Sequence, residues 1–323
     1  MQKMNDLVLG LDTSNYTTSL ALTDSGGAII TDERTILKVK QGERGLRQSH
    51  ALFQHMENLP ALIEDVFRAV RAERIKGIAA SSRPRPVEGS YMPVFKAGVS
   101  FGKALASGLS VPFYTFSHQE GHIAAAAYRT PLSDSREYLA FHLSGGTCEL
   151  LFVNNDRISV LGSSKDLSFG QVIDRLGVAM DMNFPAGKEL DRLALSLTDT
   201  TEKSCFKPIP FDGFNINLSG LETQAGRLLE SKAVNKVRLV YFVFEEISKC
   251  LIKWTEKAIA ETCCRDVLYT GGVSSSLFIR SKIGDYFAKI NDINTVFGQA
   301  SLSSDNAAGI ALLGGKMIWQ SNR

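Results

Sequence analysis

The sequence predicts an α/β protein built from two related lobes, and three observations lead to this class. Residues 7–27 and 138–156 share one pattern: an apolar run, a turn of small polar residues, a second apolar run and a second turn. Such a pattern is typical of a β-hairpin with a tight turn. After each hairpin, amphipathic helices alternate with short apolar strands. The length of 323 residues is large for a single hydrophobic core and matches two domains.

The helices and strands after each hairpin come in the same order. Residues 51–70 have the apolar spacing of an amphipathic helix, and the strand-like run 77–81 follows. In the second half, the longer helical pattern 240–263 precedes the strand-like run 266–272. One order that occurs twice in a single chain indicates duplication, and a repeat of this length is too long for a solenoid.

The positions of the two hairpins also set the expected domain boundaries. We expect a first lobe of residues 1–134, completed by a C-terminal helix over 305–323. The second lobe should span residues 135–304, with a cleft between the lobes.

The composition excludes several classes of protein. With 36 basic and 34 acidic residues the chain has a formal charge of +2, which does not indicate a nucleic-acid binder by bulk charge. No window resembles a membrane span, and the strand-like residues 7–12 leave no room for a signal peptide. The five cysteines lack the spaced pairs of a zinc knuckle or a disulfide framework. We therefore expect reduced thiols, no membrane association and a cytoplasmic location.

Three stretches of small residues are candidates for phosphate binding. Residues 12–18 and 144–147 form the two hairpin turns, and residues 269–276 follow an apolar strand and precede a helix. Turns of Ser, Thr and Gly expose backbone N–H groups and hydroxyls that can bind phosphate oxygens without a lysine. Each stretch alone is a weak signal, because most α/β proteins contain such turns. Their order and spacing together are a stronger one.

The segment "SHQEGH" carries two histidines one helical turn apart. His118 and His122 therefore share a helix face and could hold one metal ion, but two ligands make an incomplete site. Gln119 stands where a zinc-protease H-E-x-x-H helix has its base, which argues against a protease. The other three histidines are expected to be surface or packing residues: His50, His55 and His142.

Taken together, these motifs resemble the tRNA threonylcarbamoyladenosine transferases, the TsaD/Gcp family formerly called O-sialoglycoprotein endopeptidases. The resemblance implies the two-lobed fold of the sugar kinase/Hsp70/actin (ASKHA) superfamily. It also implies transfer of a threonylcarbamoyl group from an adenylate to the tRNA adenosine beside the anticodon. The matching segments run along nearly the whole chain: "GLDTS" (10–14), "SHQEGH" (117–122), "LSGGT" (143–147), "FGQVIDRLGVAMDMNFPAGKELDRLA" (169–194), "NLSGLET" (217–223), "TGGVSSS" (270–276) and "SSDNAAGIALLG" (303–314).

The resemblance supplies a third metal ligand. In that family the two histidines and an aspartate at the start of the last helix hold a divalent metal, and the matching aspartate is Asp305. Two imidazoles and a carboxylate suit Fe or Zn and leave coordination positions open. We expect the ion to join the two lobes across the cleft. From the residues alone, Asp305 would be a helix N-cap, a place that aspartate commonly takes.

The resemblance also implies a site for an adenine nucleotide, which would be threonylcarbamoyl-adenylate, ATP or ADP. The Ser-Gly-Gly turn would meet the phosphate or carbamoyl group, with Ser144 as a catalytic candidate. Asp174 would accept hydrogen bonds from the sugar hydroxyls. The full set of expected nucleotide-binding residues is Ser144, Gly145, Gly146, Asp174, Gly187, Gly272 and Ser276.

Several positions depart from the family pattern. Tyr16 and Thr17 stand where the first turn usually has an aspartate and a glutamate, so Thr17 occupies a catalytic position without an acid. Ser276 replaces an asparagine, and no histidine follows the Ser-Gly-Gly turn. The segment "SRPRPVEGSYMPV" (82–94) replaces a G-P-G loop and brings two arginines, Arg83 and Arg85. These departures indicate a divergent paralogue.

The resemblance implies tRNA as the acceptor and partner proteins of the bacterial pathway, or a homodimer. Two alternatives remain open. One is a carbamoyl or acyl transferase of the same fold that acts on a small molecule. The other is a non-catalytic nucleotide-binding partner subunit, for which a complete metal-binding triad would have no use.

Overall fold

The computed structural model describes residues 6–14, 16–39, 46–155, 157–198, 202, 204–290 and 292–320. The chain divides into two compact units. Unit 1 comprises residues 1–128 and 301–323, and unit 2 comprises residues 129–300. Among the described helices, none combines the length and the apolar character needed to cross a membrane.

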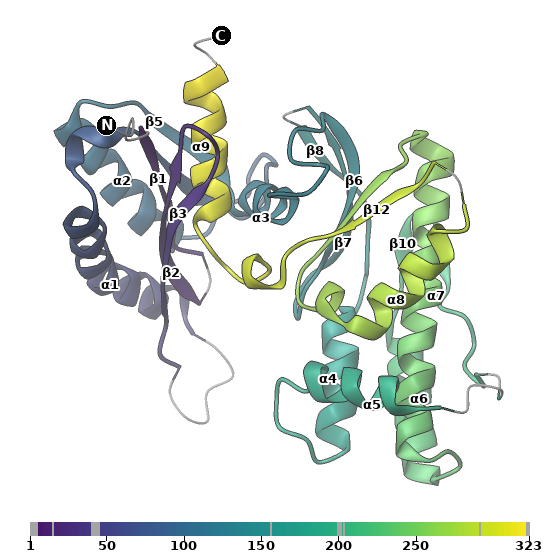
Figure 1. The fold of residues 1–323 in the computed structure, drawn as a ribbon. Helices are drawn as coiled ribbons and strands as arrows, with labels where there is room; N and C mark the ends of the chain where they lie inside the picture. Colours follow the sequence, from purple (N-terminus) through teal and green to yellow (C-terminus); the bar gives the residue numbers. More distant parts are fainter. Residues whose placement is uncertain are drawn as a thin grey trace. The chain divides into compact units, whose positions relative to one another are not determined.

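Unit 1 contains a five-stranded mixed sheet of order β3-β2-β1-β4-β5 (Figure 1). β1 pairs antiparallel with β2 and parallel with β4, and β5 extends the parallel side. The elements of unit 1 are β1 (Leu7–Asp12), β2 (Thr17–Asp24), β3 (Ile29–Ile36), α1 (Gln48–Ala69), η1 (Ala72–Arg74), β4 (Ile75–Arg83), α2 (Phe95–Leu109), β5 (Phe113–Ser117), α3 (His118–Ala127) and α9 (Ala308–Gln320), with η3 (Ala300–Leu302) at the boundary.

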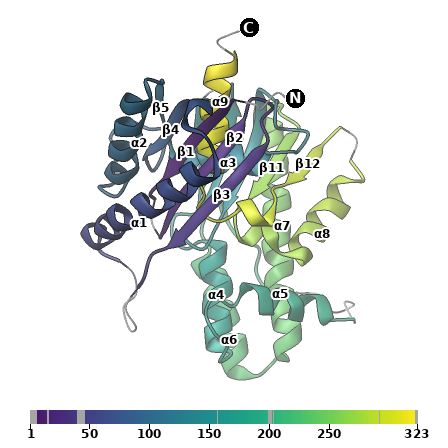
Figure 2. The ribbon, with the colours of Figure 1, turned by 60° about the vertical axis from the view of Figure 1, so that its left-hand side comes forward.

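Helices cover both faces of the unit 1 sheet (Figure 2). Leu7, Leu9 and Leu11 of β1 point to one face, where they form a buried cluster with residues of α1 and α2. The opposite face packs against α9, and the small residues Ala21 and Ala311 contribute to this packing. Strands that are buried on both faces consist of continuous apolar runs, which is why residues 7–11 gave a clear signal in the sequence.

Unit 2 repeats the strand order of unit 1. Its sheet runs β8-β7-β6-β11-β12, with β6, β7 and β8 antiparallel and β11 parallel to both β6 and β12. The predicted duplication of an α/β lobe is thus confirmed by two sheets of equivalent topology. The elements of unit 2 are β6 (Glu137–Leu143), β7 (Cys148–Asn154), β8 (Arg157–Ser163), α4 (Phe169–Ala179), α5 (Gly187–Ser196), β9 (Phe211–Asp212), β10 (Asn215–Ile216), α6 (Ser219–Ser231), α7 (Lys236–Thr262), β11 (Asp266–Thr270), η2 (Val273–Ser275), α8 (Leu277–Phe287) and β12 (Asn294–Phe297).

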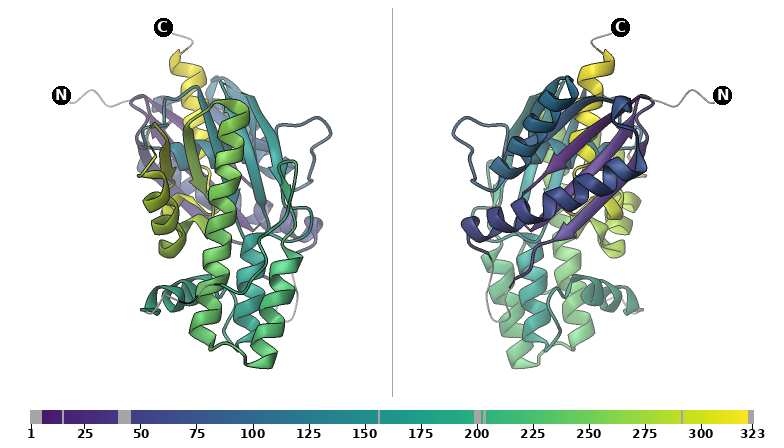
Figure 3. Two further views of the ribbon diagram at one scale, coloured as in Figure 1. Left: turned by 90° about the vertical axis from the view of Figure 1, so that its right-hand side faces the viewer. Right: turned by 90° about the vertical axis from the view of Figure 1, so that its left-hand side faces the viewer.

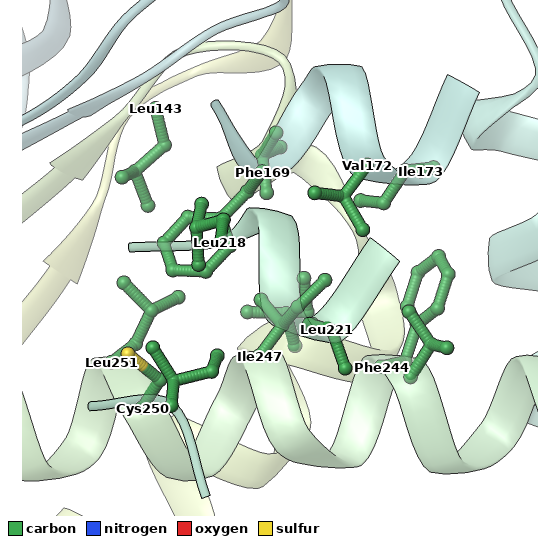
Figure 4. Packing of buried hydrophobic residues seen from close by; sticks show 14 of the residues in the cluster. Leu143, Phe169, Val172, Ile173, Leu218, Leu221, Phe244, Ile247, Cys250 and Leu251 are labelled. Atoms are coloured by element: carbon green, nitrogen blue, oxygen red, sulfur yellow. The ribbon is translucent and has the colours of Figure 1, made fainter. Parts of the chain in front are cut away.

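The long helix α7 organises the core of unit 2 (Figure 3, left). Trp254 of α7 is completely buried and meets Phe141 of β6 edge to face at 5.5 Å between ring centroids. Farther along, α7 packs against α6, which in turn contacts α4 (Figure 4). The apolar side chains that meet there are Phe169, Val172, Ile173, Leu218, Leu221, Phe244, Ile247, Cys250 and Leu251.

In unit 1, α3 and α9 cross at a pair of glycines. A Cβ atom added to Gly309 of α9 would lie 1.8 Å from the carbonyl oxygen of Gly121 in α3, so only glycine allows this approach. A Cβ on Gly10 would likewise come within 2.6 Å of the backbone of α9. These contacts hold α9 against α3 and against β1.

The glycine crossing can be tested by adding one methyl group. Gly309→Ala should lower the free energy of unfolding by about 1–3 kcal/mol, because the methyl forces α3 and α9 apart. Gly315→Ala is the matched control on the same helix, since its Cβ would make ordinary contacts, with the Trp319 ring at 3.5 Å and Oγ1 of Thr23 at 3.8 Å. The control should be neutral or slightly stabilising. Equal unfolding free energies for the two variants in urea would contradict the proposed constraint.

Candidate functional site

His118 and His122 lie on the first turns of α3, which begins directly after β5. The hydroxyl of Ser117 accepts from the backbone N–H of Glu120, and the Glu120 carboxylate accepts from that of Ser117. This capping box fixes where the helix begins. His118 is therefore the first helical residue, and His122 lies one turn later with ring centroids 4.2 Å apart.

Asp305 completes the cluster. Its Oδ1 lies 3.4 Å from Nε2 of His118 and 3.3 Å from Nε2 of His122, and the two Nε2 atoms are 2.9 Å apart. One ligand atom from each of the three residues fits within 4.8 Å of the others, which is the spacing of a metal-binding triad. Two imidazole nitrogens and one carboxylate oxygen are ligands that Zn²⁺ and Fe²⁺ accept, with positions left open for a substrate.

Two details of the predicted triad were wrong. Asp305 does not begin the last helix: α9 starts at Ala308, and Asn306 caps it by accepting from the N–H groups of Ala308 and Gly309. The triad also does not join two lobes, because all three residues belong to unit 1. The chain returns to unit 1 after residue 300, and the α3–α9 crossing then brings Asp305 to the histidines.

Asp12 is a further member of the cluster. Its Oδ2 lies 2.8 Å from Nδ1 of His118, and its Oδ1 accepts from the backbone N–H of Ser14 at 2.8 Å. A carboxylate on one ring nitrogen fixes the orientation of a histidine and leaves the other nitrogen for a metal. Sequence reasoning placed Asp12 only in the turn 12–18 as a candidate for phosphate binding, although an acid at the end of a buried strand was a signal for a role beside the histidines.

The electrostatics of this cluster favour a cation. Burial alone would lower the pKa of His118, but the carboxylates of Asp12 and Asp305 outweigh it and raise the pKa to about 10. The pKa of His122 is lowered, first by burial and then by the charge on His118. Although burial opposes it, the adjacent imidazoles hold the pKa of Asp305 well below its usual range. Two carboxylates therefore face one protonated imidazole, and the negative excess attracts positive charge.

Buried hydroxyls flank Asp12 on the same face of the sheet. Ser19 is the cross-strand partner of Asp12, and Ser81 ends the regular part of the neighbouring strand β4. Side chains alternate along a strand, so both share the face on which Ala21 and Ala79 pack against α9. Within the described part of the chain, the hydroxyls of Ser19 and Ser81 are buried without a hydrogen-bond partner. The floor of the cluster is thus polar, which fits a site that receives polar ligand atoms.

The structure places Thr17, the predicted catalytic residue of the first turn, at the start of β2. It is partly buried, and its backbone N–H donates to the carbonyl of Ser14 at 3.4 Å. Tyr16 beside it is 36% exposed. The other catalytic candidate, Ser144, belongs to unit 2 and not to the unit that carries the triad.

All of the predicted nucleotide-binding residues lie in unit 2. The Ser-Gly-Gly turn is closed by the N–H of Ser144 donating to the carbonyl of Thr147, and by the N–H of Thr147 donating to the Ser144 hydroxyl. Ser168 holds this turn against the start of α4 by donating to the carbonyl of Gly145 at 2.6 Å. Gly145 and Gly146 are exposed, and a Cβ on either would meet nothing within 4 Å, so the turn is open to a ligand.

Asp174 and Gly187 are linked through the start of α5. Oδ1 of Asp174 accepts from the backbone N–H of Ala186 at 2.9 Å, and Gly187 is the first residue of α5. Asp174 is partly exposed, so its second carboxylate oxygen is placed to accept from another donor.

Ser276 has a structural role that sequence reasoning missed. Its hydroxyl donates to the carboxylate of Asp191 and accepts from the N–H of Ile279 at the start of α8. Asp191 also accepts from the N–H groups of Leu277 and Phe278, at 3.0 and 3.1 Å. Asp191 and Ser276 therefore cap α8 together.

Of the two glycines after β11, Gly271 is the one that the fold requires. Its φ is +94°, and a Cβ there would lie 2.3 Å from the carbonyl oxygen of Leu143. Only glycine accommodates that backbone and that contact. The predicted Gly272 is exposed, and a Cβ there would meet nothing within 4 Å. The close contact at Gly271 brings the end of β11 beside the strand that precedes Ser144.

The comparison with known families agrees with these motifs. The family described as tRNA N6-adenosine threonylcarbamoyltransferase, TsaD, matches residues 31–312. The chain belongs to this family. Its membership supports a transferase in the biosynthesis of threonylcarbamoyladenosine in tRNA, with tRNA as the substrate that the family name implies.

Individual relatives match along nearly the whole chain. A tRNA N6-adenosine threonylcarbamoyltransferase of Thermus thermophilus is 29% identical over 311 residues, covering 94% of this chain and 91% of the relative. The enzyme of the same name from Thermotoga neapolitana is 28% identical over 312 residues, covering 95% and 93%.

Solved structures confirm the predicted ASKHA fold. The activator of 2-hydroxyisocaproyl-CoA dehydratase from Clostridium difficile, with bound ADPNP, is similar with a TM-score of 0.55 at 13% identity, covering 98% of this chain and 97% of the other. HypF of T. kodakarensis is similar with a TM-score of 0.64 at 13% identity, covering 97% of this chain and 47% of the other. At such low identity these likenesses establish the fold alone.

His55 lies on α1 and is completely buried. Its Nδ1 is hydrogen-bonded to Oγ1 of Thr18 at 2.8 Å, and Asn58 donates to the same Oγ1 at 3.1 Å. Burial lowers the pKa of His55 to about 4, against the opposing influence of Asp12 and Asp305. The imidazole is therefore neutral at pH 7 and packs against β2.

The low pKa of His55 predicts that the folded protein loses stability at acidic pH. An unfolded chain protonates His55 near pH 6.5, whereas the folded chain does so only near pH 4, so stability falls as the pH drops through this window. Between pH 7 and 4.5 the wild type should lose about 2 kcal/mol of unfolding free energy more than His55→Gln, which cannot titrate. Urea unfolding at several pH values measures the difference. Parallel pH profiles for the two proteins would show that His55 does not resist protonation.

Proposed function

We propose that this chain transfers a threonylcarbamoyl group from threonylcarbamoyl-adenylate to the N6 amine of the tRNA adenosine beside the anticodon. In this reaction the amine nitrogen bonds to the carbamoyl carbon, the bond from that carbon to the phosphate oxygen breaks, and AMP leaves as the amine loses a proton. The triad of His118, His122 and Asp305, found in a member of this family, is the observation that carries the proposal.

One divalent ion, Fe or Zn, would be held by this triad. When bound, it would supply a Lewis acid that polarises an oxygen of the donor. Asp12 would keep Nε2 of His118 directed at the ion through the hydrogen bond on Nδ1. The negative excess of the cluster and its polar floor support this assignment.

Unit 2 would bind the adenylate. The exposed backbone of Gly145 and Gly146, next to the Ser144 hydroxyl, would donate to the phosphate or carbamoyl oxygens. Asp174 would accept from a ribose hydroxyl with the oxygen that Ala186 does not occupy. Gly187 and Gly272 offer open backbone for a close approach of the nucleotide. Ser276 contributes through its cap of α8.

The residue at position 17 of the first hairpin turn determines the rate of transfer that we expect. Thr17 cannot position or deprotonate the attacking amine as an acid could, because its hydroxyl carries no charge and does not titrate near neutrality. We therefore propose slow transfer by the chain alone and faster transfer with partner proteins of the pathway or as a homodimer.

The absence of an acid at position 17 also favours a second candidate function, a carbamoyl or acyl transferase of this fold with a small-molecule acceptor. A non-catalytic partner subunit would leave the complete triad without a use.

The metal site can be tested by measuring the metal content of variants. His122→Ala should fold and lose most of its bound metal, because the remaining imidazole and carboxylate make an incomplete site. The control is His50→Ala, which removes an exposed histidine of α1 in the same unit. Elemental analysis after loading with Zn²⁺ or Fe²⁺ gives the metal content per chain. Unchanged metal in His122→Ala would refute the triad.

The reaction can be tested with tRNA and threonylcarbamoyl-adenylate, with and without partner proteins. We expect measurable transfer by the wild type and at least a tenfold faster rate for Thr17→Glu, which restores a carboxylate to the first turn; general acid–base catalysis contributes typically 10²–10⁴-fold. Thr115→Glu, at an exposed position of β5, controls for the added charge. Modified adenosine is quantified by mass spectrometry. If neither the wild type nor Thr17→Glu modifies tRNA, the small-molecule acceptor becomes the better interpretation.

A further inference from the structure

The last residue of β4, Arg83, lies at the edge of the sheet that carries the metal-binding triad. β1, β4 and β5 are parallel and adjacent in that order, so their carboxyl ends meet at one edge. β1 ends at Asp12, and β5 ends at Ser117, directly before His118. The hydrogen bond between Asp12 and His118 therefore spans the end of β4.

Hydrogen bonds fix the chain on both sides of Arg83. The hydroxyl of Ser82 donates to the carbonyl of Phe116 at 3.1 Å, and the N–H of Gln119 donates to the carbonyl of Pro84 at 3.1 Å. Arg83 itself pairs with Ser117 in the β4–β5 register. Its backbone is thus held beside the first turn of α3, close to both histidines.

The charge of Arg83 has no acidic partner among the described residues. It is partly buried, and its side chain makes one weak contact, 3.5 Å from Nη1 to the Ser82 hydroxyl. Arg34 and Arg68, in contrast, pair with carboxylates of unit 1. A guanidinium without a carboxylate partner remains available to bind an oxyanion.

A second observation points to a ligand at the same edge. The hydroxyl of Ser81, two residues before Arg83, is completely buried and has no hydrogen-bond partner in the described chain. It lies on the face of the sheet that carries Asp12, whereas the register shift between Ser81 and Arg83 pairs Arg83 with Ser117 at the end of the strand. A hydroxyl and a guanidinium are both donors to oxygen anions, and a guanidinium can donate two parallel hydrogen bonds to a carboxylate or a phosphate.

We propose that Arg83 binds an oxyanion of the small molecule that occupies the metal centre, whose polar floor includes Ser81, and so contributes to its specificity. This inference rests on the proposed function, whose donor carries both a carboxylate, on threonine, and a phosphate. The partial burial of Arg83 at the strand end favours such a compact ligand over the backbone of a tRNA. The sequence "SRPRP" (82–86) would then be a substrate-recognition element in place of the G-P-G loop of the family pattern.

Two small probes separate the possible oxyanions. N-carbamoyl-threonine carries the carboxylate without a phosphate, and AMP carries the phosphate without the carboxylate. Binding of each to the Zn²⁺-loaded protein is measured by calorimetry or ligand-observed NMR. Arg83→Gln should weaken at least one probe about tenfold or more, as expected for the loss of a charge-assisted hydrogen bond. Arg83→Lys, which retains the charge but not the planar fork, should bind with intermediate affinity.

Arg71→Gln is the matched control. Arg71 is exposed and precedes the opposite end of β4, so this variant removes an equal charge from the same unit away from the triad. Melting temperatures and bound zinc establish that each variant is folded and loaded. A probe weakened by Arg83→Gln and unaffected by Arg71→Gln supports the proposal and identifies the oxyanion.

Three results would overturn it: unchanged binding of both probes in Arg83→Gln, equal weakening by Arg71→Gln, or no binding of either probe by the wild type. Weaker tRNA binding in Arg83→Gln with both probes unaffected would assign Arg83 to the nucleic acid and would also reject the proposal. Transfer to tRNA by the wild type is scored separately. The proposed function can therefore stand when the role of Arg83 fails.

Discussion

The contact between Gly121 of α3 and Gly309 of α9 is the constraint on which the arrangement of unit 1 depends. No side chain fits between these two backbones, since even a Cβ on Gly309 would overlap the carbonyl of Gly121. The crossing fixes the residues before α9 relative to the first turns of α3. Asp305 consequently reaches two histidines that precede it by more than 180 residues. The cluster of His118, His122 and Asp305 is thus a product of helix packing between the two ends of unit 1.

The hydrogen bond that Asp12 accepts from Nδ1 of His118 ties the sheet to this arrangement. Asp12 is the last residue of β1, and His118 follows the last residue of β5, so the bond joins two strand ends that flank β4. Burial would raise the pKa of the Asp12 carboxyl, but the adjacent His118 lowers it and keeps the group ionised. A buried carboxylate that accepts a hydrogen bond from one ring nitrogen of a histidine leaves the second nitrogen available to a ligand. Nε2 of His118 therefore faces Asp305, and residues from the sheet, α3 and the segment before α9 meet at one cluster.

The duplicated topology presents two different kinds of candidate site. In unit 1, the carboxyl ends of parallel strands carry titratable side chains that suit a cation. In unit 2, the equivalent edge carries the Ser144–Thr147 turn, in which the open backbone of Gly145 and Gly146 would suit an anion. The same strand order thus supports both, because ligand-binding loops at strand ends can change while the sheet is retained. The departures at Thr17 and Arg83 also fall in such loops and strand ends.

The sequence by itself determined the local features of this protein. The two hairpins, the helix with His118 and His122, and the Ser-Gly-Gly turn all follow from residue patterns a few positions long, and the matching topology of the two sheets confirmed the duplication. The aspartate at position 305 was found through resemblance, but its place at the helix start was misjudged, because local pattern alone could not show that Asn306 caps α9. Only the tertiary structure revealed the partner of Asp12, the capping role of Asp191 and Ser276, and the position of Arg83. These three features depend on contacts between residues far apart in the chain. Such contacts follow from the order of the strands and from which side chains are buried, and neither can be read from a short residue pattern.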